Sequence, residues 1–155
     1  MPDHSLAISI ANMKKFFDKG TSCFTEEHSG FAPKPGMFTV AQHVAHAAQV
    51  VEWFVEGAFS DTGMTTDFAE HEKHVRAVKS LAEARAWMDR AVKRATEKVN
   101  ATSMVDMMRP IAPGIMGGVP RIAIVESMAE HTAHHRGALA VYARLLNLVP
   151  PMPYM

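Results

Sequence analysis

Residues that could do chemistry gather in one stretch of the chain, ESMAEHTAHHRGALAVYARLL, which spans residues 126–146. This stretch holds three histidines, His131, His134 and His135. Residues four apart lie about 40° from each other on a helix, so His131 and His135 share one apolar line, which Tyr142 extends. His134 is rotated toward the flank. Two imidazoles one turn apart can direct their ring nitrogens at a single metal ion.

A metal held by two such ligands needs a third from a facing helix, as sites in the cores of helical bundles provide it. The segment TVAQHVAHAA offers two candidates, His43 and His46, which helical periodicity does not separate. A lone buried histidine is more often a hydrogen-bonded core residue. The i, i+4 pair together with a histidine on another helix nevertheless favours metal ligation. Three imidazoles leave a tetrahedral zinc ion one open position, as in catalytic sites.

The spacing of His131 and His135 also matches the HExxH motif of zinc proteases, in which glutamate follows the first histidine as general base. Here that position is Thr132. Glu130 precedes the pair and is rotated by about 100° on the helix. The sequence therefore excludes the protease interpretation.

Other residues with chemical potential have simpler explanations. Tyr142 could donate a proton near the pair, but its position fits an ordinary half-buried tyrosine. Arg136 fits an ion pair or a helix-end contact. His71 and His74, in EHEKH, lie among charged neighbours and fit a solvated loop. Cys23 has no neighbour that would lower the pKa of its thiol, which fits a packing residue.

Four segments with apolar residues at helical spacing must position the histidines, and they cover about 6–19, 39–59, 80–99 and 120–147. Thr39 and Ser80 are the expected N-caps of the second and third, and SLAE matches a capping box. No β-alternating run of useful length is present. The expected fold is all-α, a four-helix bundle, and the two longest connections favour crossovers rather than plain hairpins.

Length and charge exclude several function classes. The chain of 155 residues is expected to form a single domain, residues 1–155. Sixteen basic residues balance sixteen acidic ones, so no net charge attracts nucleic acid or an anionic membrane. The apolar runs are too short to span a bilayer, the start lacks a secretory signal, and the single cysteine fits a reducing compartment. We therefore expect a cytoplasmic protein.

Three motifs in the chain resemble the DinB/YfiT-like family. The segment EHTAHHRGALAVYARLLNLVPPMPY is similar to the last helix of that family, whose pattern is roughly HxxHHRGQL…YxRLxGxxPP. MFTVAQHVAHAA resembles its second helix, in which the metal-binding histidine follows an initial Thr or Ser by seven residues. SLAEARAWMDRA is similar to its third helix. The resemblance spans nearly the whole chain.

The resemblance implies a four-helix bundle of up-down-down-up topology that holds a divalent metal, zinc or nickel, with three histidines. By position these are His46, His131 and His135, and not His43. It also implies a homodimer and thiol-dependent transfer or isomerisation with a low-molecular-weight thiol such as bacillithiol or mycothiol. The chain departs from the family at Ala138, where the usual glutamine would place an amide near the metal. Asn147 replaces a glycine at the helix end, where asparagine tolerates a left-handed conformation.

Three interpretations of function remain open at this point. The first is a metal-dependent enzyme of the thiol-transferase or hydrolase type, in which an activated thiolate or hydroxide attacks a small electrophile. The second is a non-catalytic metal-binding protein of the stress or damage response. The third is an interaction module that dimerises or docks through Trp53, Phe54 or the methionine-rich segment MVDMMRPIAPGIM.

Overall fold

The computed structural model describes residues 4–155, where all regular structure is helical apart from an isolated bridge between Pro110 and Pro120. The elements along the chain are α1 (His4–Gly20), the 3-10 helix η1 (Glu26–His28), α2 (Val40–Ala58), α3 (Phe68–Ala77), α4 (Leu81–Asn100), α5 (Met104–Met107) and α6 (Ala123–Leu145). The all-α class expected from the sequence is confirmed. None of the described helices is both long enough and apolar enough to cross a membrane.

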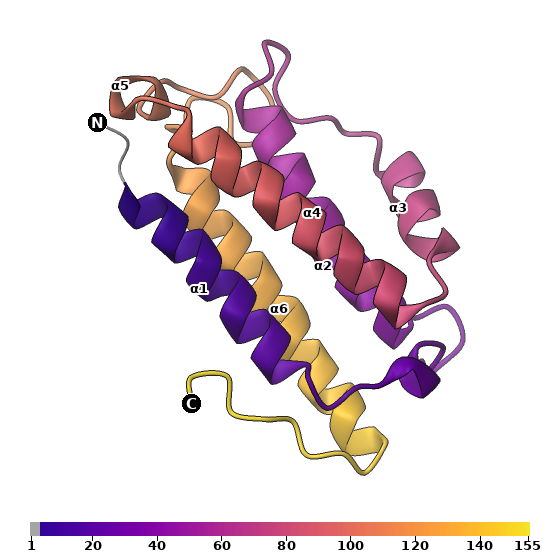
Figure 1. Cartoon of the computed structure of the whole chain (residues 1–155). Helices are drawn as coiled ribbons and strands as arrows, with labels where there is room; N and C mark the ends of the chain where they lie inside the picture. The colour runs from indigo at the N-terminus through magenta and orange to yellow at the C-terminus, as the bar shows by residue number, and fades with distance from the viewer. Residues whose placement is uncertain (1–3) are drawn as a thin grey trace.

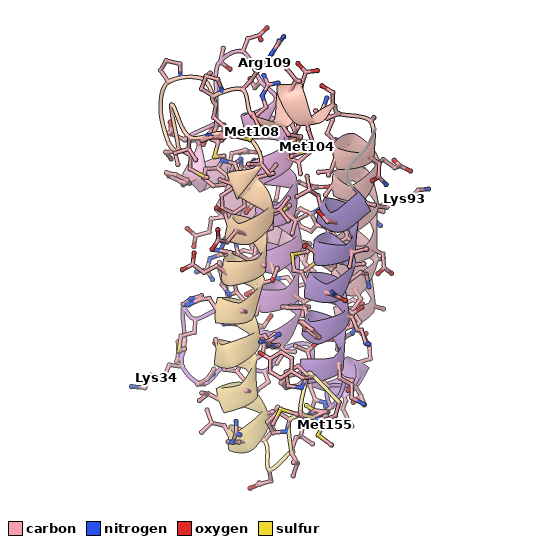
Figure 2. The ribbon with its side chains drawn as sticks, turned by 90° about the vertical axis from the view of Figure 1, so that its left-hand side faces the viewer. Lys34, Lys93, Met104, Met108, Arg109 and Met155 are labelled. Atoms are coloured by element: carbon pink, nitrogen blue, oxygen red, sulfur yellow. The ribbon has the colours of Figure 1, made fainter. Side chains whose placement is uncertain are left out.

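The four long helices, α1, α2, α4 and α6, lie side by side (Figure 1). α2 packs against α4 and α6, and α1 packs against the same two helices. Figure 2 shows α1 and α6 next to each other, with Met104 and Met108 at one end of the molecule and Met155 near the other. Each fully buried large apolar side chain between the helices stabilises the fold by about 1.5–3 kcal/mol. Examples are Phe17, Met88, Ile124 and Leu139.

The start of α2 is fixed by a reciprocal cap. The Thr39 hydroxyl accepts a hydrogen bond from the Gln42 backbone N–H at 3.2 Å, and the Gln42 amide oxygen accepts one from the Thr39 N–H at 3.0 Å. These bonds satisfy two of the N–H groups that a helix leaves without partners at its start. The predicted N-cap is therefore confirmed, and it sets where His43 and His46 emerge from the helix. Ser80 caps α4 by accepting from the Glu83 N–H, but only this half of the capping box predicted from SLAE is formed. The carboxylate of Glu26 accepts from the next N–H groups, those of Leu81 and Ala82.

The structure corrects the sequence prediction in the connection after α2. A polar loop with at most a short helical turn was expected there, but α3 is a ten-residue helix capped by Asp67, which accepts from the Glu70 N–H. Val75 is the buried residue of α3. A helix that buries so little has no apolar stripe to reveal it in the sequence.

The last helix is shorter than the sequence indicates. It begins at Ala123 rather than near Pro120, because Pro120 lies in a turn whose carbonyl accepts the Ala123 N–H at 3.0 Å. It ends at Leu145, and Asn147 just beyond adopts the left-handed conformation expected there, with φ of 58°. The histidines lie in the middle of this helix, away from both ends.

Candidate metal centre

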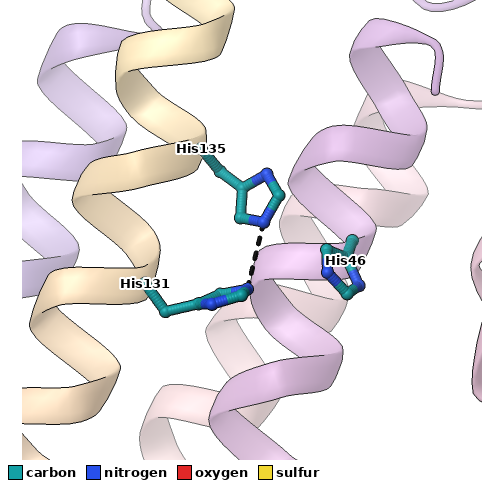
Figure 3. A group of neighbouring side chains, drawn as sticks. All are labelled: His46, His131 and His135. Carbon is teal, nitrogen blue, oxygen red and sulfur yellow. Dashed lines mark hydrogen bonds between the residues drawn. The ribbon is translucent and has the colours of Figure 1, made fainter. Parts of the chain in front are cut away.

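Three histidines from two helices meet between α2 and α6. His46 projects from α2 toward His131 and His135 on α6 (Figure 3). Each offers one ring nitrogen, and these three atoms all lie within 4.8 Å of one another. The Nε2 atoms of His131 and His135 are 3.0 Å apart. The residues that the sequence proposed as ligands are thus brought together, and the group could hold a metal ion.

The spacing of the ring nitrogens fits a tetrahedral ion. Zn–N bonds of about 2.0–2.1 Å place two nitrogens on the same zinc roughly 3.4 Å apart. The 3.0 Å between the Nε2 atoms of His131 and His135 is close to that value. The ring nitrogen of His46 lies no more than 4.8 Å from either of the other two ligand atoms. The separations within the group are therefore compatible with three nitrogens on one ion.

Burial keeps the imidazoles in the neutral form that a metal requires. Desolvation lowers the pKa of His131 to about 4 and, together with the neighbouring histidines, that of His135 to about 2. Burial also lowers the pKa of His46, and this effect outweighs a hydrogen bond to Gln49 that raises the pKa. Near neutral pH a metal ion would therefore not have to displace protons from positively charged rings.

His43 lies beside the group rather than in it. Its Nδ1 is 3.0 Å from the Nδ1 of His135, and its Nε2 is 3.1 Å from the hydroxyl of Tyr142. Tyr142 is only 3% exposed, and its hydroxyl donates to the Phe38 carbonyl at 2.9 Å. The prediction of an ordinary half-buried tyrosine is therefore wrong, because this side chain is buried and its hydroxyl contacts His43.

Two cavities reach the histidine group. A cavity of about 370 Å³ is lined by His46 and His131. Five apolar side chains form much of its wall, Phe38, Val50, Trp53, Phe54 and Phe68. Gln49 and Glu72 also line it. A second cavity, of about 480 Å³, shares Trp53, Phe54 and His131 with the first. Its other lining residues are Ile115, Met116, Ser127, Glu130 and His134. The two cavities make the group accessible to a small molecule.

One residue of the first cavity was missed by the sequence prediction. His71 was expected in a solvated loop, but it belongs to α3 and lines the cavity. Because α3 lacks an apolar stripe, no pattern in the sequence indicates which of its residues face inward. Its neighbour His74 is exposed and pairs with Glu70 at 2.8 Å, as a solvated histidine would.

The remaining candidates lie outside the group. His134 is exposed on the flank of α6, as its rotation predicts. Arg136 donates to the Tyr154 hydroxyl at 3.2 Å and stacks over that ring, which makes it a contact to the C-terminal segment. Ala138, in place of the family's usual glutamine, is partly buried. Cys23 packs against the core, and burial raises the pKa of its thiol, in agreement with a packing role.

Comparison with known families agrees with this geometry. A family described as the DinB superfamily matches residues 17–139, which is most of the chain and includes the three histidines. No curated protein sequence matches the chain. The chain belongs to the DinB superfamily, so the resemblance noted in the sequence is confirmed.

Proposed function

We propose that this protein is a metal-dependent enzyme of the thiol-transferase or hydrolase type that acts on a small electrophile. The observation that carries the proposal is the group His46, His131 and His135, placed beside a cavity that the first two line. Structural zinc sites are closed by four protein ligands, whereas three histidines leave one position for water or substrate. Zinc or nickel is the expected metal, since imidazole suits both.

When bound, such a metal lowers the pKa of a water or thiol in its open position and so makes a nucleophile near neutral pH. The residues of the chain supply the other requirements. The aromatic walls of the cavity hold an apolar substrate and exclude water from it. In thiol transfer, the sulfur bonds to the electrophilic carbon, the leaving group departs with its bonding electrons, and the thiol proton passes to solvent. In hydrolysis, a water oxygen takes the place of the sulfur.

The charges around the cavities limit the substrate. Among the residues that line the two cavities at the histidine group none is Lys or Arg, whereas Glu72 lines one and Glu130 the other. The nearby Arg76 pairs with Glu72 at 2.7 Å and donates to the Gly36 carbonyl. An anionic substrate would find no free cationic side chain there. These observations favour a substrate with an uncharged, apolar body.

We further propose that the chain forms a single domain, with its four long helices in a bundle of up-down-down-up order. In support, α1 and α6 run in one sense along the molecule in Figure 1 and α2 and α4 in the other. The packing of α2 against both α4 and α6 also fits that order. The homodimer and the cytoplasmic location implied by the sequence stay predictions.

The first test is the metal content of the purified protein, which we expect to be about one zinc or nickel ion per chain. Metal-loaded protein is then assayed with an uncharged aromatic electrophile, 4-nitrobenzyl chloride, and a panel of low-molecular-weight thiols. Hydrolysis is assayed with 4-nitrophenyl acetate. We expect turnover that disappears on metal removal and in His131→Ala but persists in His74→Ala, since His74 is exposed and lines neither cavity at the histidine group.

Two results would overturn the enzymatic proposal. One is equal turnover by the metal-free and metal-loaded protein. The other is full metal occupancy with no turnover of any electrophile or ester, which would instead support the non-catalytic metal-binding role. Equal loss of activity in His131→Ala and His74→Ala would show that the assay reports on folding rather than on the site.

A further inference from the structure

A series of hydrogen-bonding groups connects the candidate metal site to a backbone carbonyl. It begins at Nε2 of His135, crosses that ring to Nδ1, and passes to Nδ1 of His43 at 3.0 Å. It crosses the second ring to Nε2, which lies 3.1 Å from the Tyr142 hydroxyl. The series ends at the Phe38 carbonyl, which accepts a hydrogen bond from that hydroxyl at 2.9 Å. Every link is within hydrogen-bonding distance.

The carbonyl at the end determines the direction of every bond in the series. A carbonyl oxygen can only accept a hydrogen bond, so Tyr142 must donate its single hydroxyl hydrogen to Phe38. The tyrosine oxygen can then only accept from His43, which therefore carries its proton on Nε2. A neutral imidazole has one N–H, so Nδ1 of His43 is bare and accepts from His135. His135 in turn is protonated on Nδ1 and bare on Nε2.

The bare nitrogen is the one that faces the other candidate ligands. Nε2 of His135 lies 3.0 Å from Nε2 of His131, within the group that could hold the metal. The opposite tautomer would place a hydrogen there and block coordination through that atom. This assignment of protons requires neutral imidazole rings. Burial favours the neutral ring of His43, since it lowers the pKa of that ring to about 4.

We infer that His43 and Tyr142 are positioning residues that hold His135 in the tautomer required for metal binding. The inference rests on the proposed metal site and deepens it. Neither residue touches the metal or the substrate in this arrangement, and both act through the His135 ring. Partners of this kind also fix the orientation of the ligand ring, and their loss typically weakens metal binding by 10–100-fold.

The variants that test the inference separate hydrogen bonding from shape. Tyr142→Phe keeps the ring in the core and removes only the hydroxyl. His43→Leu removes the acceptor for His135, whereas His43→Asn restores an acceptor oxygen near the position of Nδ1. Tyr154→Phe is the matched control, since Tyr154 is 66% exposed and its hydroxyl bonds to Arg136 instead.

The first measurement is the tautomer of His135 in metal-free wild-type protein, from ¹H–¹⁵N NMR correlations of the imidazole ring. We expect the proton on Nδ1, and a mixture of tautomers in Tyr142→Phe and His43→Leu. This readout needs neither metal nor activity, so it distinguishes a failure of this inference from a failure of the proposed function.

The second measurement is zinc affinity by competition with a chelator. We expect it to fall 10–100-fold in Tyr142→Phe and His43→Leu, to recover in His43→Asn, and to stay unchanged in Tyr154→Phe. A proton on Nε2 of His135 in the wild-type protein would overturn the inference. So would wild-type zinc affinity in Tyr142→Phe, a variant that keeps the aromatic ring in the core and removes only the hydroxyl.

Discussion

His135 is more tightly held than the other two candidate ligands. It is 6% exposed, and both of its ring nitrogens lie 3.0 Å from another histidine nitrogen. His46 and His131 are half-buried and line the cavity. His46 and His131 are therefore the two candidate ligands that a molecule in the cavity could approach, whereas His135 would hold the metal from within the core.

The same burial makes the metal-free protein sensitive to acid. The pKa values of His43 and His131 are lowered to about 4 in the folded state, against an ordinary value of 6.5. As the pH falls below 6.5, the unfolded chain therefore takes up protons that the folded chain does not, and stability is lost until about pH 4. Each ring contributes less than the full value of about 1.4 kcal/mol per pH unit, since it is partly exposed.

We expect the melting temperature of metal-free protein to be level above pH 7 and to fall steadily between pH 6.5 and 4.5. The fall should be shallower in His135→Gln, which removes the ring whose pKa is lowered most. It should be unchanged in Tyr154→Phe, because Tyr154 is 66% exposed and is not among the groups that lower these pKa values. A flat profile across this range, or equal slopes in the two variants, would contradict the prediction.

The helices differ in how far the sequence predicts them, and the difference follows from what they bury. α2 and α4 have capping residues and continuous apolar stripes, so their starts at Thr39 and Ser80 could be read from the sequence. α3 buries little more than Val75 and was missed. Local pattern therefore predicts the elements that build the core but not the one that covers the cavity.

The candidate site shows the same limit. The i, i+4 spacing places His131 and His135 together within one helix, so that pair could be predicted from periodicity alone. The choice between His43 and His46 depends on how α2 is rotated against α6, which periodicity does not encode. Only the family resemblance separated them. The link from His43 to Tyr142 joins residues 99 positions apart and had no signal in the sequence.

The cap of α2 should matter for the site as well as for stability. Thr39→Ala removes the acceptor for the Gln42 N–H, and we expect a loss of about 1 kcal/mol in the free energy of unfolding. Because His43 lies in the first turns after this cap, fraying there should also weaken zinc binding. Chemical denaturation and a chelator competition measure the two effects.

Ser80→Ala provides the matched control, since the Ser80 side chain also accepts from the N–H three residues on but α4 carries none of the three histidines. It should cost a similar free energy of unfolding and leave zinc affinity unchanged. If both cap variants weakened zinc binding equally, general loss of stability would explain the effect and the local role of the α2 cap would be wrong.

A metal in this site would join two helices that lie far apart in the chain, since His46 is on α2 and the other two ligands are on α6. The unfolded chain does not hold these residues together, so binding energy adds to the stability of the folded state. At a free zinc concentration 100 times Kd, the gain is about 2.7 kcal/mol. For a chain of this length, that corresponds to a rise in melting temperature of roughly 5–10 °C.

We expect this rise in the wild-type protein and in the double variant His71→Ala/His74→Ala, and its loss in His131→Ala/His135→Ala. Both variants remove two histidines from one helix, but only His131 and His135 belong to the group that could hold a metal ion. Hydrogen exchange should slow on zinc binding most strongly in the middle of α2 and α6, which carry the three histidines, and less in α1. An equal rise in both double variants would mean that zinc binds elsewhere on the molecule, because a site that links α2 to α6 needs the histidines of α6.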